Sequence, residues 1–560
     1  MSADGKPAHE PQPQAKNDTQ VYAIYGVEPE VQAYAMAKYS RSALSLKESL
    51  AEISTQQAEK FLNTFYFQYG HRSIADLAHI AMAIERLSLL AAIVLEDEQR
   101  WDGQERSTRY QDFSHPDHYT PDSLRACTSH VGHVGEPCEF CGCPHPAMSD
   151  LYRDSIDFLF TEYRFFSEQM FQYLVERTPR PADMKPDAYE RTLRARAFDI
   201  ARYLLPLATN TSLGQIVNAR TLENQVSRLL SHTHAEVRAL GEKLKDAAKN
   251  PAYNVHAPEV SRIVAEVADK QPDLARRLQA VLLKDVCTAP TLVKYADPNA
   301  YFTETREELQ QAARELMNGA QVEHAPEVDL LDDEPAEIEI ATTLLYEHCR
   351  YPYRQLHGAV EALGENRRNE IIALGAKHRG KHDELLRAYC AGQKFRFDIL
   401  MDVGAFRDLH RHRRCVQIHQ GFTFAHGFDM PREIADSGNQ ARYAEAMQRA
   451  REAAGQMSSV LNTNVTDPHL PRTGRYGAPT GSECPEAQYL LPLAYRKRTL
   501  FKMDFAEVVY ISELRTTPAG HFSYRNIAYQ MYEAVARRHP ALAEYFRVCD
   551  VREPVDLLKR

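Results

Sequence analysis

The sequence predicts a helix-rich α+β protein built from two copies of one domain, and three observations lead to this fold class. The segment 201–208 (ARYLLPLA) recurs at 487–494 (AQYLLPLA), about half the chain away, with seven of eight positions identical. Short β-branched or aromatic runs, such as 422–424, leave room for strands. Apolar residues at the three and four spacing of amphipathic helices occur in 150–177, 190–206, 219–249 and 435–463.

Composition limits the class of protein. With 560 residues, 44% apolar and 26% charged, the chain can bury a sizeable core and form two to four domains, at about 150 residues each. The longest strongly apolar stretch, 87–95, is far shorter than the roughly 20 residues that span a bilayer. A formal charge of −10 argues against nucleic acid as a partner. The polar, Pro-rich residues 1–19 lack the apolar core of a signal peptide, so we expect a disordered tail and a cytoplasmic protein.

The repeat divides the chain into two domains. The segment 285–290 (DVCTAP) interrupts the helical pattern, which predicts a first domain over 20–285 and a second over 299–560. Each copy of the repeat is followed by a helical segment that ends in a glutamate and an arginine, Glu236 with Arg238 and Glu513 with Arg515. The two halves are therefore expected to be fused copies.

Two motifs stand out in the first half. The segment 71–76 (HRSIAD) opens an apolar run, and its Ser73 and Asp76 are placed like a helix-capping pair. About 30 residues later, 104–110 (QERSTRY) offers a serine and arginines that could cradle a phosphate, because Arg forks onto phosphate and Ser donates a hydroxyl. A solvated charged loop is the alternative.

The second half has a basic cluster at 407–414 (RDLHRHRR), close after the apolar run 397–401. Such a cluster is costly to bury unless it meets an anion. The alternative is an exposed basic patch.

Together these fragments resemble the flavin-dependent thymidylate synthases. The family signature is an Arg-His-Arg triplet, seven residues, then Ser-x-Arg-Tyr; the triplet resembles 411–413 and the end of the signature resembles 105–110. The upstream family motif resembles 71–76, with Asp76 in place of Glu. The downstream motifs resemble Arg202 before Leu205-Pro206, and Asn218-x-Arg220 with Asn224. The resemblance covers 20–250 and, weakly, 340–530.

Each half departs from the family pattern. At the triplet position the first half reads Asp97-Glu98-Gln99. The second half keeps the triplet but has Gly421 in place of Ser, and Gln488 where the first half has Arg202. The halves have lost complementary parts, which predicts one composite site per chain and an abandoned mirror site.

The resemblance implies methylation of dUMP to dTMP with FAD, methylenetetrahydrofolate as the carbon source and a reduced nicotinamide (NADPH). The family uses no cysteine nucleophile, so Cys415 is expected to be a buried thiol. Arg515 would polarise the pyrimidine as a fixed cation, the catalytic role. The substrate-binding residues would be Glu105, Arg106, Ser107, Thr108, Arg109, Asp408, Arg411, Gln488 and Arg515. The FAD-binding residues would be His71, Ser73, Asp76, Glu105, Asn218, Arg220, Asn224, Arg411, His412 and Arg413.

The family homotetramer implies that two copies of this chain form a homodimer that mimics it. Two alternatives remain: an enzyme acting on another pyrimidine, and a flavin- or nucleotide-binding scaffold without synthase activity. The absence of a Gly-x-Gly-x-x-Gly loop argues against a Rossmann reductase.

A cysteine-rich insertion at about 115–148 lengthens the first half. Its paired ligands predict a structural zinc site, with His133, Cys143 and His145 as competing ligands. The predicted ligands are Cys127, His130, Cys138 and Cys141. The alternative is a loop with scattered surface thiols.

Overall fold

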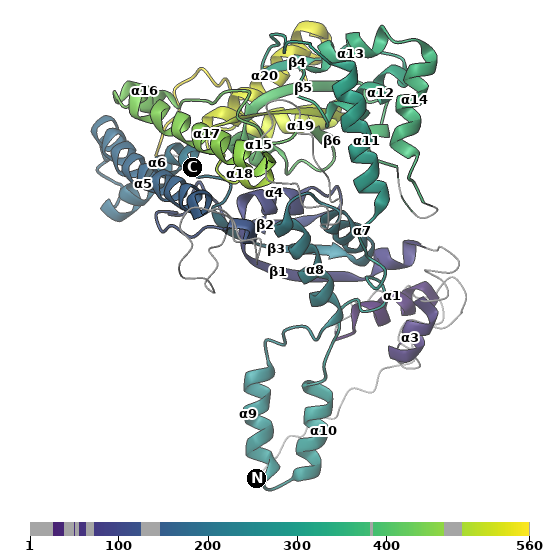
Figure 1. Ribbon diagram of the computed structural model, residues 1–560. Coiled ribbons are helices and arrows are strands. Elements are labelled where there is room, and N and C mark those ends of the chain that lie inside the picture. The colour runs from purple at the N-terminus through teal and green to yellow at the C-terminus, as the bar shows by residue number, and fades with distance from the viewer. Residues whose placement is uncertain are drawn as a thin grey trace.

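The computed structural model describes residues 26–38, 50, 55–62, 72–124, 146–380, 383, 385–463 and 484–558. Helices predominate, and two small antiparallel sheets lie between them (Figure 1). The expectation of a helix-rich α+β fold is confirmed. Among the described residues, every helix falls short of the length or the apolarity needed to cross a bilayer.

The first half carries one sheet and the helices around it. Its elements are α1 (Pro29–Lys38), α3 (Thr55–Leu62), η2 (Arg72–Leu77), β1 (His79–Ser88), α4 (Leu89–Glu96), β2 (Asp102–Glu105), η3 (Asp122–Leu124), α5 (Pro146–Arg177), α6 (Pro186–Ala201), η4 (Arg202–Leu204), β3 (Asn210–Asn218), α7 (Ala219–Leu230) and α8 (Ala235–Lys249).

A helical hairpin and a connecting helix precede the second sheet. The remaining elements are α9 (Ala257–Ala268), α10 (Pro272–Leu282), α11 (Ala300–Leu316), β4 (Val328–Leu330), α12 (Ala336–Tyr346), α13 (Tyr353–Glu361), α14 (Glu365–Ala376), η5 (Arg387–Tyr389), β5 (Phe395–Asp402), α15 (Val403–Leu409), β6 (Val416–His419), α16 (Arg432–Asp436), α17 (Gln440–Thr463), α18 (Pro485–Gln488), β7 (Arg496–Met503), α19 (Phe505–Arg515), α20 (Phe522–Arg538) and α21 (Pro540–Ala543).

The helical segments expected from the sequence are present, with ends set by local chemistry. The expected 219–249 helix breaks into α7 and α8, and α6 stops at Ala201 ahead of Pro206, which lacks the N–H that a helix needs. Helix α17 begins only after Gly438, whose φ of +77° no helix tolerates. The expectation of a strand at 422–424 was wrong: β6 ends at His419, and the following segment is irregular, although Phe422 and Phe424 are buried.

The two sheets share one strand order. The first is β1-β3-β2 and the second is β4-β5-β7-β6, so that β4 adds an edge to an otherwise matching arrangement. All pairs are antiparallel. Four of these strands run directly into a helix, and each turn is capped by the last strand residue or its neighbour. Ser88, Asn218, Asp402 and Asp504 each accept a hydrogen bond from the first turn of the helix that follows.

The two copies of the sequence repeat pair with each other at the junction of the halves. The N–H of Leu207 donates to the carbonyl of Leu491 (2.9 Å), and the N–H of Leu493 donates to the carbonyl of Leu205 (3.0 Å). Pro206 faces Pro492 between them. Each bond is repeated with the roles of the two copies exchanged, which is the pattern of an isologous, two-fold contact.

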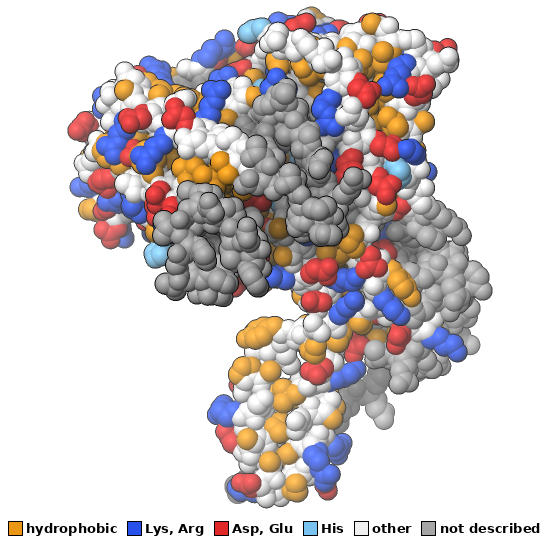
Figure 2. Space-filling model, in the orientation of Figure 1, with side chains coloured by type: hydrophobic (Ala, Val, Ile, Leu, Met, Phe, Trp, Pro, Cys, Tyr) orange, Lys and Arg blue, Asp and Glu red, His pale blue; other side chains and the backbone are white. Residues whose placement is uncertain are grey.

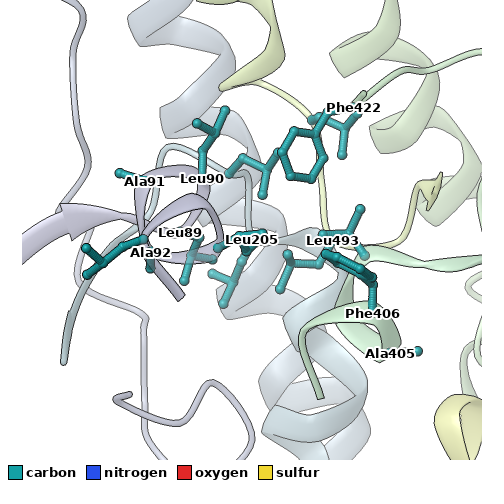
Figure 3. Close-up of a cluster of buried hydrophobic side chains, with 14 of the residues drawn as sticks. Leu89, Leu90, Ala91, Ala92, Leu205, Ala405, Phe406, Phe422 and Leu493 are labelled. Atoms are coloured by element: carbon teal, nitrogen blue, oxygen red, sulfur yellow. The ribbon is translucent and has the colours of Figure 1, made fainter. Parts of the chain in front are cut away.

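One hydrophobic core extends across this junction. Figure 3 shows side chains of α4 and the first repeat copy packed against those of α15 and the second copy. Leu89, Leu205, Phe406 and Leu493 are all fully buried there. On the far side, α5 of the first half packs along α17 of the second (Figure 1). The halves therefore share their interior.

The hairpin of α9 and α10 projects from this body as an arm (Figure 1). Of its helical residues only Ala275 is buried, and Figure 2 shows apolar side chains among charges on its surface. The arm closes at its base, where the N–H of Ala252 donates to the carbonyl of Val286 (2.8 Å).

Candidate functional site

The motif at the end of β2 and the basic cluster 407–414, which begins in α15 and continues past its end, meet across the junction of the halves. The buried carboxylate of Glu105 accepts hydrogen bonds from Arg407 Nη2 (2.6 Å) and Arg411 Nη2 (3.4 Å). Thr108 Oγ1 accepts another from Arg407 Nη1 (3.2 Å). The structure thus brings together two residues predicted for one site, Glu105 and Arg411, that lie about 300 positions apart in the sequence.

Arg109 is fixed in a buried ion pair. Its Nε and Nη2 donate to Asp199 (2.9 and 3.3 Å), Nη1 donates to the hydroxyl of Tyr524 (3.0 Å), and Nη2 also donates to the carbonyl of Ala519 (3.0 Å). Burial alone would raise the pKa of Asp199, but His521, Arg109 and Arg202 hold it well below its usual range. Arg109 therefore ties α6 to α20 and has few donors left for a ligand.

Arg202 joins the same cluster from the first half. Its Nη2 donates to Asp408 (3.1 Å), and its Nε lies 3.5 Å from Asp199. Burial would raise the pKa of Asp408, yet Arg202 and Arg109 lower it. Gln488, predicted as a substrate contact, lies elsewhere, because its side chain hydrogen-bonds His234.

Arg515 is held by a neutral imidazole. Its Nε donates to His412 Nε2 (2.7 Å), and its guanidinium lies 5.4 Å from the ring centre of Tyr524. Burial lowers the pKa of His412, although Glu507 lies 3.6 Å from its Nδ1. The imidazole accepts at Nε2 and stays uncharged, so Arg515 keeps the positive charge at this position.

Glu96 and Trp101 lie among the same side chains and were not predicted from the sequence. Burial and the neighbouring Glu105 raise the pKa of Glu96 to about 7, against the opposing effect of Arg411, Arg407 and Arg413. The guanidinium of Arg413 lies 4.3 Å from the ring centre of Trp101. An acidic residue at the C-terminal end of an apolar helix opposes the helix dipole, and that signal could have drawn attention to Glu96.

Two other predicted substrate contacts have local roles. Arg106 donates to Gln111 and to the carbonyl of Asp112 and covers Phe113, so it belongs to the exposed loop. The hydroxyl of Ser107 accepts from the N–H of Arg109 (3.2 Å).

Several guanidinium groups of the cluster keep a buried donor without a hydrogen-bond partner among the described residues. Such donors are costly to leave unpaired, and an anion would satisfy them. They are the Nε atoms of Arg202, Arg407, Arg411 and Arg413. We call these four residues, with Arg109 and Arg515, the arginine cluster.

A cleft of about 880 Å³ lies between α7, α11, η5 and the end of β6, and no residue of the arginine cluster lines it. Arg220 and Asn224, both predicted for FAD, line it on α7, and its volume suits a cofactor-sized ligand. Asp76 pairs with Arg220 (3.4 Å). The cleft therefore fits FAD in its volume and in the hydrogen-bond donors that α7 supplies.

The remaining predicted FAD contacts lie outside this cleft. The side chain of Asn218 caps α7, and Ser73 is exposed in η2. Arg411, His412 and Arg413 are absent from the cleft lining, where the residues at the matching positions of the first half, 97–99, stand instead. One chain does not bring the two predicted FAD sets into one cleft. His71 and the predicted zinc ligands Cys127, His130, Cys138 and Cys141 lie outside the described residues.

The fold and the site define a helix-rich α+β protein with a cluster of arginines between two similar halves. The chain belongs to the thymidylate synthase complementing protein family (Thy1), whose model matches residues 24–252 and 330–541. It is thus a member of the flavin-dependent thymidylate synthase-like family, in a fused form.

Relatives of similar length match almost the whole chain. A UPF0159 protein of Chlamydia muridarum is 28% identical over 561 residues, covering 96% of this chain and 93% of that protein. UPF0159 protein Ta1429 of Thermoplasma acidophilum is 24% identical over 539 residues, covering 92% and 94%.

Two solved structures are also similar. The UMP/dUMP methylase PolB of Streptomyces cacaoi, bound with 5-Br dUMP, is 18% identical with a TM-score of 0.25, covering 39% of this chain and 84% of that one. The flavin-dependent thymidylate synthase ThyX of Helicobacter pylori, complexed with FAD and dUMP, is 16% identical with a TM-score of 0.23, covering 40% and 89%.

Proposed function

We propose that this protein methylates a pyrimidine deoxynucleotide, dUMP to dTMP, at one composite site between its halves. The observation that carries the proposal is the arginine cluster itself. Buried Nε donors from both halves lack a hydrogen-bond partner among the described residues, and three of these four arginines, Arg202, Arg411 and Arg413, stand at positions of the family motifs. A nucleotide phosphate is an anion that such donors bind, and Arg presents a fork that matches it.

The described residues suggest a division of roles. Arg411 is about one-third exposed, and its buried Nε has no hydrogen-bond partner in the part of the chain that the structure describes, so it would receive the phosphate, with Arg407 beside it on Glu105. Arg515 stays cationic beside a neutral His412 and would stabilise negative charge that develops on the pyrimidine ring. Arg109, saturated by Asp199 and Tyr524, positions the loop that carries Ser107 rather than acting as a free phosphate ligand.

FAD, when bound, would supply the hydride, with methylenetetrahydrofolate as the carbon source and NADPH as the reductant. Arg220 and Asn224 would hold it from the cleft. His412 and Arg413 would reach a second flavin-binding position, which favours a homodimer in which the neighbouring chain completes the contacts.

We further propose that residues 20–285 and 299–560 form a covalent pseudo-dimer. The shared strand order, the matching helix caps and the reciprocal pairing of the repeat copies support it.

A second candidate, a nucleotide- or flavin-binding scaffold without synthase activity, is favoured by a specific observation. Most guanidinium groups of the cluster already pair with carboxylates, namely those of Glu105, Asp199 and Asp408. An enzyme acting on another pyrimidine remains the third candidate.

The test compares Arg411→Ala with Arg414→Ala, a matched control in the same loop whose guanidinium is exposed and pairs with Asp504. We expect dUMP affinity, measured by calorimetry on the flavin-loaded protein, to fall about 10- to 100-fold in the first variant, because one charge-assisted phosphate contact is worth about 1.5–3 kcal/mol. The control should bind as the parent does.

Turnover separates the candidates. Formation of dTMP from dUMP, methylenetetrahydrofolate and NADPH supports the proposal. Tight dUMP binding and flavin absorbance without dTMP would favour the scaffold, and equal affinity in both variants would contradict the composite site.

A further inference from the structure

The mirror site, which the sequence analysis expected to be abandoned, contains its own cluster of ligand atoms. Asp97 follows the start of α4 by as many residues as Arg411 follows the start of α15, and His419 ends β6 as Glu105 ends β2. The pair of Glu105 and Arg411 thus has a counterpart in Asp97 and His419, with the charges exchanged between the halves. His410 completes a group of three whose ligand atoms lie within 4.8 Å of one another.

The hydrogen bonds of Gln417 fix the tautomer of His410. The amide Nε2 of Gln417 donates to the carbonyl of His412 (2.8 Å), so its Oε1 faces His410 Nδ1 at 2.8 Å and accepts a hydrogen bond from it. The proton therefore sits on Nδ1. The imidazole is almost fully buried, and its Nε2 has no hydrogen-bond partner among the described residues.

This unprotonated Nε2 faces a carboxylate. Asp97 Oδ1 lies 3.8 Å from His410 Nε2, and Asp97 Oδ2 lies 3.4 Å from His419 Nε2. Two acceptors that face each other, one of them on an almost fully buried imidazole, are unfavourable unless a cation lies between them. Metal bonds of about 2.0–2.2 Å in a tetrahedral site place neighbouring ligand atoms roughly 3.3–3.6 Å apart, close to these separations.

We propose that Asp97, His410 and His419 bind a divalent first-row transition metal ion that joins the two halves. Two imidazoles and one carboxylate form a donor set that suits Zn²⁺ or Fe²⁺ and disfavours Mg²⁺. The site does not depend on the nucleotide chemistry proposed above, although it borders the cleft proposed for FAD.

The surroundings agree with a metal site of the open kind. Gln417 orients His410, and the hydrogen bond from Arg387 to Asp97 Oδ1 orients the carboxylate. The other charged groups near Asp97 are Lys497 and Glu98, and Glu347 lies near Lys497 and Arg387. Asp97 and His419 line the 880 Å³ cleft, so a fourth coordination position would face it and take water or an oxygen of a bound ligand.

The experiment titrates metal-stripped full-length protein with Co²⁺ and records the absorption spectrum. Cys138→Ser/Cys141→Ser serves as the background, because thiolate ligands would add charge-transfer bands of their own. We expect one equivalent of Co²⁺ per chain with visible d–d bands and no thiolate bands, and competition by Zn²⁺. In the Asp97→Asn and His419→Gln variants the affinity should fall at least tenfold.

Two further variants make the result decisive. His348→Gln changes a histidine that lines the same cleft outside the cluster, and it should bind Co²⁺ as the background does. Gln417→Met should weaken binding about 10- to 100-fold, as loss of an orienting hydrogen bond does. Circular dichroism checks that each variant is folded. No Co²⁺ uptake by the folded background protein, or equal uptake by His419→Gln, would overturn the proposal.

Discussion

Glu105 forms ion pairs with two arginines from the other half of the chain, Arg407 and Arg411. These ion pairs hold together the two parts of one family signature, which lie in different halves. The charges of Glu105 and Arg407 are both almost fully buried. Removing one partner of such a pair leaves an unpaired buried charge, which is strongly destabilising. We therefore expect Glu105 and Arg407 to contribute to stability whether or not a ligand is bound.

The raised pKa of Glu96 predicts that the stability of the protein depends on pH. Burial and Glu105 raise its pKa from 4.5 to about 7 in the folded protein. Between these values the folded state holds a proton that the unfolded state has released, so stability falls as the pH rises from about 4.5 to 7. Glu96→Gln removes this effect, and its melting temperature should exceed that of the parent by several degrees above pH 7.5 and match it near pH 4.5.

Glu85→Gln, on the exposed side of β1, is the control and should show no such pH-dependent difference. Parallel pH profiles for the parent and Glu96→Gln would contradict the raised pKa.

The sequence allowed part of the site to be predicted. Glu105 and Arg411 were identified because they belong to a signature with a fixed order. Arg407 and Arg202 could not be assigned partners, since Glu105 and Asp408 lie 302 and 206 positions away, and pairing over such distances depends on how the halves dock. The pairing of Asp97 with His419, in which the acidic and basic residues have changed halves, could not be predicted for the same reason.

Among the elements, the helices that face the core were predicted better than the arm. Helices α5, α6 and α17 have apolar stripes that meet a partner, so the sequence pattern and the burial agree. Helices α9 and α10 also have apolar residues at helical spacing, yet Val281 is 75% exposed. The pattern shows that a helix has an apolar face, but the position of that face in the fold depends on contacts made elsewhere.

The arm should be removable. Replacing 253–285 with Asn-Gly would join Ala252 to Val286, which already share a backbone hydrogen bond, through a two-residue turn. The deletion removes one buried helical residue, Ala275, and an ion pair between Lys284 and Glu28 in which the lysine is half exposed. We expect the melting temperature to change by no more than about 4 °C, since an exposed pair contributes about 1 kcal/mol or less.

A matched variant, Ala252→Pro, keeps the arm but removes the N–H that closes its base. It should lower the melting temperature more than the deletion does. A deletion variant that unfolds would show that the arm stabilises the body.

At the scale of the whole molecule, the shared core implies that the halves unfold together. Side chains of both halves form one cluster around the paired repeat copies (Figure 3), and ion pairs such as that of Arg442 with Glu162 connect α17 to α5 at the periphery. Neither half could bury its junction residues alone. We therefore expect a single cooperative transition in calorimetry rather than one for each half.

Substitutions in the paired repeat copies test whether the halves unfold together. Leu205 and Leu493, one from each repeat copy, are both fully buried and joined by a backbone hydrogen bond, so Leu205→Ala and Leu493→Ala should each destabilise the junction. Each should lower the free energy of unfolding by about 2–5 kcal/mol through lost burial and a residual cavity, measured by urea denaturation.

The control is Leu514→Ala, at an exposed position of α19, which should lower the free energy of unfolding by less than about 0.5 kcal/mol. Because the two leucines are neighbours at the junction (Figure 3), the cost of the double variant should differ from the sum of the single costs by more than about 0.5 kcal/mol. Two separate transitions, with each substitution shifting only one, would show that the halves are independent domains and that the reciprocal pairing of the repeat copies contributes little to stability.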